Sequence, residues 1–320
     1  MKRNDANWLG YAEISPSAPV VAGSYGTWTL TYVVGKYGVD DGGRLKVAMR
    51  HASDWGVWQM DEPREDNYAT ATVLTQQSAK VRLEFAPKGY LRPFFKTLVV
   101  TVYDGSLSEG DKVVLTFGDT NSGSRGMKAQ SFVETRFEFR VAVECFETDV
   151  FYEVPGDTCL KVVSAPVARL LALAESRCSV GQTIDVFLKA EDMFGNPAHL
   201  EGGEVEILRD EHVMIETRAR NHSVRGEVAA YGAQFTRPGV HVLRFSHTPT
   251  GLSCNTNPIQ VLQSPAEHRL YWGDFHGQSG YSIGTAASTN TFGMQETSRC
   301  LISPLTTRTT SRCTPSTGKN

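Results

Sequence analysis

The sequence lacks several features that would place it in a specialised class. It has no apolar run of about 18 residues, the length that a transmembrane helix needs. It has no basic stripe, and its formal net charge of −3 disfavours a nucleic acid partner. The N-terminus, MKRNDANWLGYAEIS, is basic but has no apolar segment typical of a secretory signal. We therefore expect a cytoplasmic protein with no nucleic acid or membrane partner; secretion by a signal outside this sequence is the alternative.

Cysteine patterning is also absent. The six cysteines are widely spaced and form no Cys-x-x-Cys pair. In a chain of 320 residues this spacing indicates neither a disulfide framework nor a zinc site. Hydrophobic residues make up 40% and charged residues 21%, as in globular proteins with real cores. We expect free thiols in one to three folded domains.

Residues 1–165 show the alternation of β-strands and no helical period. In GTWTLTYVVG, the large side chains of Trp28, Leu30 and Tyr32 alternate with threonines, so the two sets face opposite sides of a strand. Turn residues separate the runs. The same alternation recurs at RLKVAMR (44–50), KVRLEF (80–85), KTLVVTVYDG (96–105), DKVVLTFGD (111–119) and TRFEFRVAVECF (135–146). This pattern predicts an antiparallel β-sandwich over residues 1–165.

A second β region covers residues 166–262. Ile184, Val186, Leu188 and Ala190 share one face of a strand that ends in the turn sequence Asp-Met-Phe-Gly-Asn-Pro. The strand runs that follow complete a set of about seven strands, the size of an immunoglobulin-like sandwich. The sequence thus predicts an all-β fold of two antiparallel sandwiches, the second immunoglobulin-like.

Two tryptophans in the segment SDWGVWQMDEP (53–63) give a first candidate site. Exposed aromatic rings beside carboxylates can stack on sugars, which would make Trp55 and Trp58 a ligand platform. The alternative is that both rings cover the end of the sandwich core. The sequence leaves both interpretations open.

The segment GDFHGQSG (273–280) gives a second candidate. Asp274 and His276 alternate on an extended segment, so both side chains point to one face. A carboxylate and an imidazole together suit Zn, Mn or Fe. Two ligands alone are too few for a metal site. The alternative is that Asp274 caps the turn and His276 is exposed.

The longer segment HRLYWGDFHGQSGYSIGT (268–285) resembles the start of the catalytic domain in a bacterial family of unknown function. That family has a PHP-like (polymerase and histidinol phosphatase) metal-dependent hydrolase domain and long N-terminal β regions similar to residues 21–56. The resemblance implies that residues 263–285 begin an α/β barrel, with Asp274 and His276 as metal ligands. PHP domains typically open with His-x-His, whereas Gln278 stands at the third position here. This departure puts the first metal pair in doubt.

The remaining segment, residues 286–320, is rich in Thr, Ser and Arg and has neither helical nor strand period. One interpretation is a disordered tail. The other is a frameshift, because a shifted frame after Thr285 permits an amphipathic helix of the kind that a barrel needs there. In both cases the barrel is truncated, and this chain is expected to be catalytically inactive.

Two functions follow from these patterns. The first is the accessory β region of a PHP-like hydrolase, whose intact form would use Zn, Mn or Fe to activate water against a phosphoester or amide in an unknown small-molecule substrate. The second is a carbohydrate- or partner-binding β-sandwich module without catalysis. The sequence specifies neither the substrate nor the metal.

Overall fold

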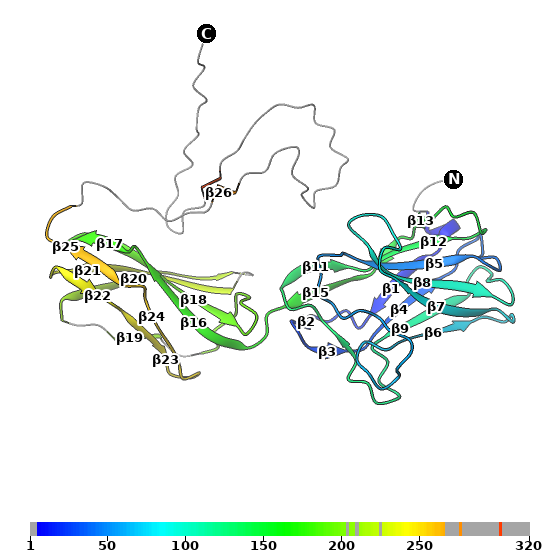
Figure 1. Ribbon diagram of the computed structural model, residues 1–320, viewed down its shortest axis with the longest axis horizontal. Coiled ribbons are helices and arrows are strands. Elements are labelled where there is room, and N and C mark those ends of the chain that lie inside the picture. The colour runs from blue at the N-terminus through cyan, green and yellow to red at the C-terminus, as the bar shows by residue number, and fades with distance from the viewer. Residues whose placement is uncertain are drawn as a thin grey trace, which may run out of the picture. The chain divides into compact units, whose positions relative to one another are not determined.

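The computed structural model describes residues 5–202, 205–208, 211–223, 226–265, 275–276 and 301–302. The chain divides into two compact units, unit 1 (Met1–Ala165) and unit 2 (Pro166–Asn320). Apart from the one-turn helix α1 (Ala6–Leu9), the regular elements in the described residues are strands (Figure 1). The predicted all-β class is therefore confirmed. Within the described ranges, no helix is long and apolar enough to cross a membrane.

Unit 1 is built on two five-stranded sheets. The first has the order β14 (Gly156–Asp157), β1 (Tyr11–Ser15), β4 (Trp28–Val33), β9 (Lys112–Phe117), β6 (Ala69–Leu74). The second has the order β13 (Tyr152–Glu153), β12 (Arg140–Glu144), β5 (Arg44–Met49), β8 (Lys96–Tyr103), β7 (Lys80–Ala86). Two smaller sheets are β11 (Glu134–Glu138), β15 (Cys159–Val163), β2 (Val20–Val21), and β10 (Met127–Lys128), β3 (Tyr25–Gly26). Neighbouring strands pair antiparallel, except that β1 pairs with β14, and β2 with β15, in parallel.

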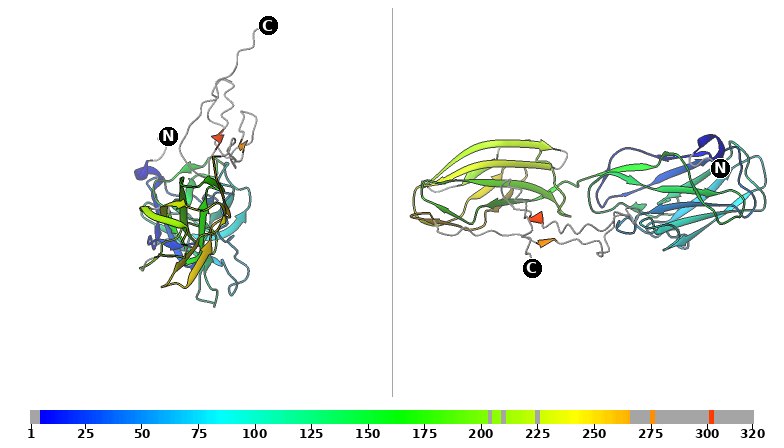
Figure 2. Two further views of the ribbon diagram at one scale, coloured as in Figure 1. Left: turned by 90° about the vertical axis from the view of Figure 1, so that its left-hand side faces the viewer. Right: turned by 90° about the horizontal axis from the view of Figure 1, so that it is seen from above.

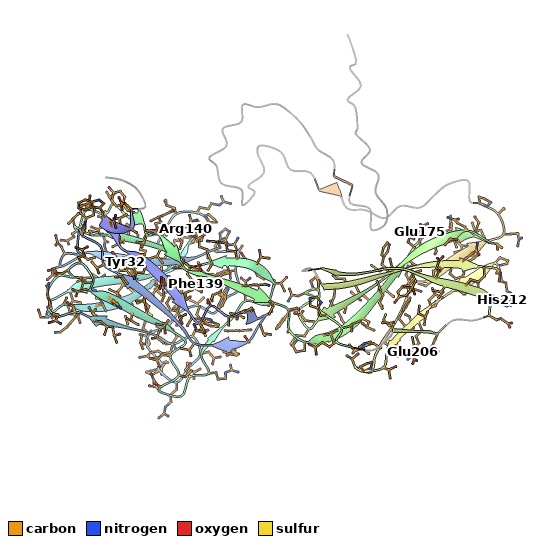
Figure 3. All side chains as sticks on the ribbon, turned by 180° about the vertical axis from the view of Figure 1, so that it is seen from behind. Tyr32, Phe139, Arg140, Glu175, Glu206 and His212 are labelled. Atoms are coloured by element: carbon orange, nitrogen blue, oxygen red, sulfur yellow. The ribbon has the colours of Figure 1, made fainter. Side chains whose placement is uncertain are left out.

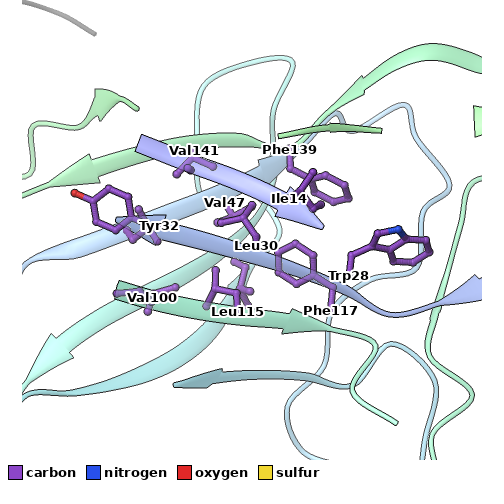
Figure 4. Close-up of a cluster of buried hydrophobic side chains, with 14 of the residues drawn as sticks. Ile14, Trp28, Leu30, Tyr32, Val47, Val100, Leu115, Phe117, Phe139 and Val141 are labelled. Atoms are coloured by element: carbon purple, nitrogen blue, oxygen red, sulfur yellow. The ribbon is translucent and has the colours of Figure 1, made fainter. Parts of the chain in front are cut away.

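The core of unit 1 lies between its two large sheets. The alternation seen in the sequence puts Trp28, Leu30 and Tyr32 of β4 on the buried face, while the threonines between them stay partly exposed. Val47 and Val100 face them from the second sheet (Figure 4). Full burial of an aliphatic or aromatic side chain contributes roughly 1.5–3 kcal/mol, so this double layer dominates the stability of the unit.

Unit 2 is a separate sandwich of immunoglobulin-like type, as predicted (Figure 2). Its four-stranded antiparallel sheet has the order β16 (Val167–Ala174), β18 (Thr183–Asp192), β21 (Gly226–Phe235), β20 (Val213–Ser223). Two three-stranded sheets are β17 (Arg177–Ser179), β25 (Ile259–Leu262), β22 (Gly239–His241), and β19 (Val205–Leu208), β23 (Arg244–His247), β24 (Leu252–Asn255). In these sheets only β17 and β25 pair in parallel. The core combines side chains from all three sheets.

The predicted barrel start (263–285) and tail (286–320) fall almost entirely outside the described residues. The exceptions are residues 263–265 and the short strands β26 (Phe275–His276) and β27 (Leu301–Ile302), which pair with each other. Both segments therefore stay predictions.

Candidate functional site

The tryptophan platform predicted from the sequence is wrong. Trp55 and Trp58 are each only 1% exposed and belong to the core of unit 1. The Trp55 ring lies 5.2 Å from Trp28, edge on, and 5.1 Å from Phe137. The backbone of the loop is held inward, because Gly56 N–H donates to the carbonyl of Lys128 over 2.8 Å. Both rings close the end of the sandwich and cannot stack on a ligand.

The predicted metal ligands are not described by the structure. Asp274 lies outside the described residues, and His276 is described only as the end of β26, without its side chain. Elsewhere in the described part of the chain, no three His, Cys, Asp or Glu side chains come close enough to hold a metal ion. The Zn, Mn or Fe site thus stays a prediction that rests on the resemblance.

The structure instead gathers three rings at the surface of unit 1, two of them exposed and the third, Tyr37, half-buried against the core between them. We call Trp8, Tyr37 and Phe146 the aromatic row. The ring centroids of Trp8 and Tyr37 are 5.0 Å apart at an interplanar angle of 34°, and those of Tyr37 and Phe146 are 5.7 Å apart at 76°. Trp8 is 43% exposed and Phe146 44%. Large rings usually cover core, so two exposed rings joined by a half-buried third indicate a contact surface.

Helix α1 carries Trp8, and its position is determined by the core. The Asp5 carboxylate caps the helix by accepting a 3.0 Å hydrogen bond from Asn7 N–H. The next residue after Trp8, Leu9, is buried, and its carbonyl accepts a 2.6 Å hydrogen bond from the hydroxyl of Tyr32. Figure 3 labels the Tyr32 side chain in unit 1. Burial raises the pKa of Tyr32 well above its usual value, so this donor keeps its proton at physiological pH. With Leu9 inside, Trp8 is turned outward.

The loop between β4 and β5 brings Tyr37 against Trp8. The carbonyl of Trp8 accepts a 3.1 Å hydrogen bond from Tyr37 N–H, and Asn7 is joined to the neighbouring Lys36 in the same way. This approach needs two glycines. A Cβ at Gly10 would lie 1.9 Å from the carbonyl oxygen of Val33, and one at Gly35 would lie 2.3 Å from Gly10 N. Gly10 also has φ of +83°, a conformation that glycine favours.

Phe146 comes from a third segment, directly after β12. The preceding residue, Cys145, is buried, and its carbonyl accepts a 2.9 Å hydrogen bond from Asp40 N–H. Burial, with a smaller effect of nearby Glu144 and Asp40, raises the pKa of the Cys145 thiol to about 11. That thiol is therefore an inert core side chain, and it anchors the exposed Phe146 ring.

The charges around the aromatic row are mainly negative. Asp40, Asp41 and Glu147 are exposed on the two loops that carry Tyr37 and Phe146. The Glu147 carboxylate lies against Gly42, which places it beside the Asp40–Asp41 turn. These three carboxylates form no ion pair with another described residue. Lys36 is the nearby cation, and its Nζ atom lies 5.6 Å from the centroid of the Trp8 ring.

Sequence reasoning did not find the aromatic row. Trp8, Tyr37 and Phe146 each follow or precede a turn, and none belongs to a motif. They meet only because α1, the β4–β5 loop and the loop after β12 are joined by backbone hydrogen bonds. A partial signal was available, because Asp5, a capping residue, stands three positions before Trp8 and predicts a short helix there.

Comparisons with known proteins give structural likeness only. No protein-family model matches the sequence, and no curated protein matches it. Among solved structures, similarity is found to domains 5-6 of the S-layer protein SbsC, with 11% identity, 80% of this chain and 99% of that chain covered, and a TM-score of 0.25. The D00-D0 domain of intimin is 10% identical, with 78% of this chain and 99% of that chain covered and a TM-score of 0.29. The C-terminal domain of the AgI/II polypeptide BspA of Streptococcus agalactiae is also 10% identical, with 78% of this chain and 99% of that chain covered and a TM-score of 0.30. At such values the likeness has no bearing on function.

Proposed function

We propose that the described part of this chain is a binding module without catalysis, and that unit 1 contacts its ligand through the aromatic row. The observation that carries the proposal is the exposure of two rings, Trp8 and Phe146, joined by the half-buried ring of Tyr37 that contacts both. Aromatic side chains supply large contact area at low entropic cost, and they dominate binding energy where they are buried by a partner.

The support of the rings favours binding over a purely structural role. The backbones of Trp8 and Tyr37 are hydrogen-bonded to each other, and Cys145, the residue before Phe146, is hydrogen-bonded to Asp40, so little backbone freedom is lost when a ligand covers the rings. The rings of Trp8 and Phe146 leave much of their surface uncovered, which a stabilising cluster would bury. The alternative function, the accessory region of a PHP-like hydrolase, depends on Asp274 and His276 and stays a prediction.

The test is a ligand screen with a matched pair of variants. Labelled protein is applied to a glycan array and to a peptide array, together with Trp8→Ala and Phe132→Ala. Phe132 is also about 40% exposed and precedes β11, away from the row, so it controls for the loss of any exposed ring. We expect binding that is lost in Trp8→Ala and kept in Phe132→Ala. No binding on either array, or binding that Trp8→Ala retains, would refute the proposal.

A further inference from the structure

The proposed function does not specify the kind of ligand. The charges around the aromatic row restrict the chemical classes of ligand that fit there. Resting on that function, we infer that the partner is a protein segment rich in Lys and Arg, which places cationic side chains on the rings of Trp8, Tyr37 and Phe146 and against the carboxylates beside them. Three parts of the surface chemistry favour such a partner: the sign of the surface charge, the nature of the rings, and a contact of the same type within the chain.

The first part is electrostatic complementarity. Asp40, Asp41 and Glu147 are exposed, and none of them is neutralised by an ion pair among the described residues. Glu109 is a further exposed carboxylate at this end of the unit, because Gly110 N–H donates to the carbonyl of Val34 over 2.9 Å, and the exposed Lys112, which pairs with Val33, is a second cation there beside Lys36. The four carboxylates thus outnumber the two cations. Such a surface attracts a basic segment and repels an acidic one.

The second part is the chemistry of the rings. The face of an aromatic ring carries partial negative charge and attracts a Lys ammonium or an Arg guanidinium within about 6 Å of the centroid. Trp gives the strongest attraction of the aromatic side chains, and Trp8 is the exposed Trp among the described residues. Arg adds planar stacking on such rings, so a segment with Arg gains more than one with Lys alone.

The third part is a contact that the chain already makes. Lys36 Nζ lies 5.6 Å from the centroid of Trp8, which shows that a cation is accommodated at this ring. Lys36 itself is exposed and lies on the loop of Tyr37. No Lys or Arg side chain of the described residues lies over the ring of Tyr37 or Phe146, and the half-buried Tyr37 ring connects Trp8 to the exposed Phe146 ring. A basic segment bound along the row would place further cationic side chains on the rings, as Lys36 does on Trp8.

The experiment is a titration followed by tryptophan fluorescence. Trp28, Trp55 and Trp58 are buried, so among the described tryptophans Trp8 reports on an added peptide. The probe is a short peptide of alternating Gly and Arg, compared with the same peptide in which Glu replaces Arg. We expect a saturable change in Trp8 fluorescence with the Arg peptide only, and weaker binding with added salt. Isothermal titration calorimetry, which does not need the Trp8 signal, should show about fivefold weaker binding of the Arg peptide to Trp8→Ala.

A matched pair of charge variants tests the carboxylates. Asp40→Asn/Glu147→Gln removes two charges beside the row, and Asp61→Asn/Glu62→Gln removes the same number from exposed positions on another loop. We expect about a fivefold loss of affinity in the first double variant and an unchanged affinity in the second. Equal losses in both would show non-specific attraction and overturn the inference. Neutral glycans that bind in a Trp8-dependent manner, while the Arg peptide does not, would overturn it too and leave the proposed function standing. If no probe binds, both fail.

Discussion

Truncation of Trp55 to alanine should be among the most damaging single changes in unit 1. The ring is 1% exposed and contacts Trp28, Phe137 and Phe139, with centroid separations of 5.2, 5.1 and 5.6 Å. Trp→Ala in a core of this kind costs about 3–5 kcal/mol, because the apolar contacts are lost and a cavity remains. Against a total stability of about 5–15 kcal/mol, that is a large fraction.

Trp55→Phe separates packing from hydrogen bonding at the same position. The indole Nε1 of Trp55 has no hydrogen-bond partner among the described residues. Replacement by Phe therefore removes ring volume without breaking a side-chain hydrogen bond, and we expect a cost of about 1–2 kcal/mol, well below that of alanine.

Urea denaturation followed by circular dichroism measures both changes, with Trp8→Ala as the control. Trp8 is half-exposed, so its truncation should cost about 1 kcal/mol or less. If Trp55→Ala destabilises unit 1 no more than Trp8→Ala does, Trp55 does not contribute to stability as a buried core ring, and the conclusion that it is a core residue and not a ligand platform is refuted.

Three further predictions concern the support of the aromatic row. Tyr32→Phe leaves the buried carbonyl of Leu9 without its 2.6 Å hydrogen bond, so the free energy of unfolding measured in urea should fall by about 1–3 kcal/mol. A loss below about 0.5 kcal/mol would contradict this expectation. Gly10→Ala forces a Cβ against the Val33 carbonyl at a φ of +83°, so we expect a loss of at least about 1–3 kcal/mol and greater quenching of Trp8 by acrylamide. The pKa of Cys145 rises from 9.0 to about 11 on folding, so the unfolded chain loses this proton first as the pH rises from 9 to 11. Between pH 9 and 11 the free energy of unfolding of the wild type should therefore fall by about 3 kcal/mol more than that of Cys145→Ala. An identical pH dependence in the two proteins would refute the raised pKa of Cys145.

The strands were predictable because their patterns are local. Trp28, Leu30 and Tyr32 were expected on one face of a strand, and all three are buried. Ile184 and Val186 behave in the same way in β18. A period of two reports which side of a strand is apolar, and a sandwich buries that side whichever neighbours it acquires.

The candidate site was not predictable because it depends on distant segments. Trp8 and Trp55 both stand outside the strands and near acidic residues, yet one is 43% exposed and the other 1%. What distinguishes them is the packing around each segment: the buried Leu9 turns Trp8 of α1 outward, while Gly56 is hydrogen-bonded to Lys128 and the Trp55 ring packs against Trp28 and Phe137. Contacts between residues so far apart in the chain leave no trace in a local pattern.

The parallel pairing of early strands with strands at the end of each unit has a consequence for how the chain folds during translation. In unit 1, β1 and β2 find their partners in β14 and β15, and in unit 2, β17 finds its partner in β25. Neither sandwich can therefore close until its final strand has left the ribosome, at about residue 163 for unit 1 and residue 262 for unit 2. Closing such long loops is slow, so each nascent unit carries open sheet edges throughout its synthesis and then completes its fold in one late step.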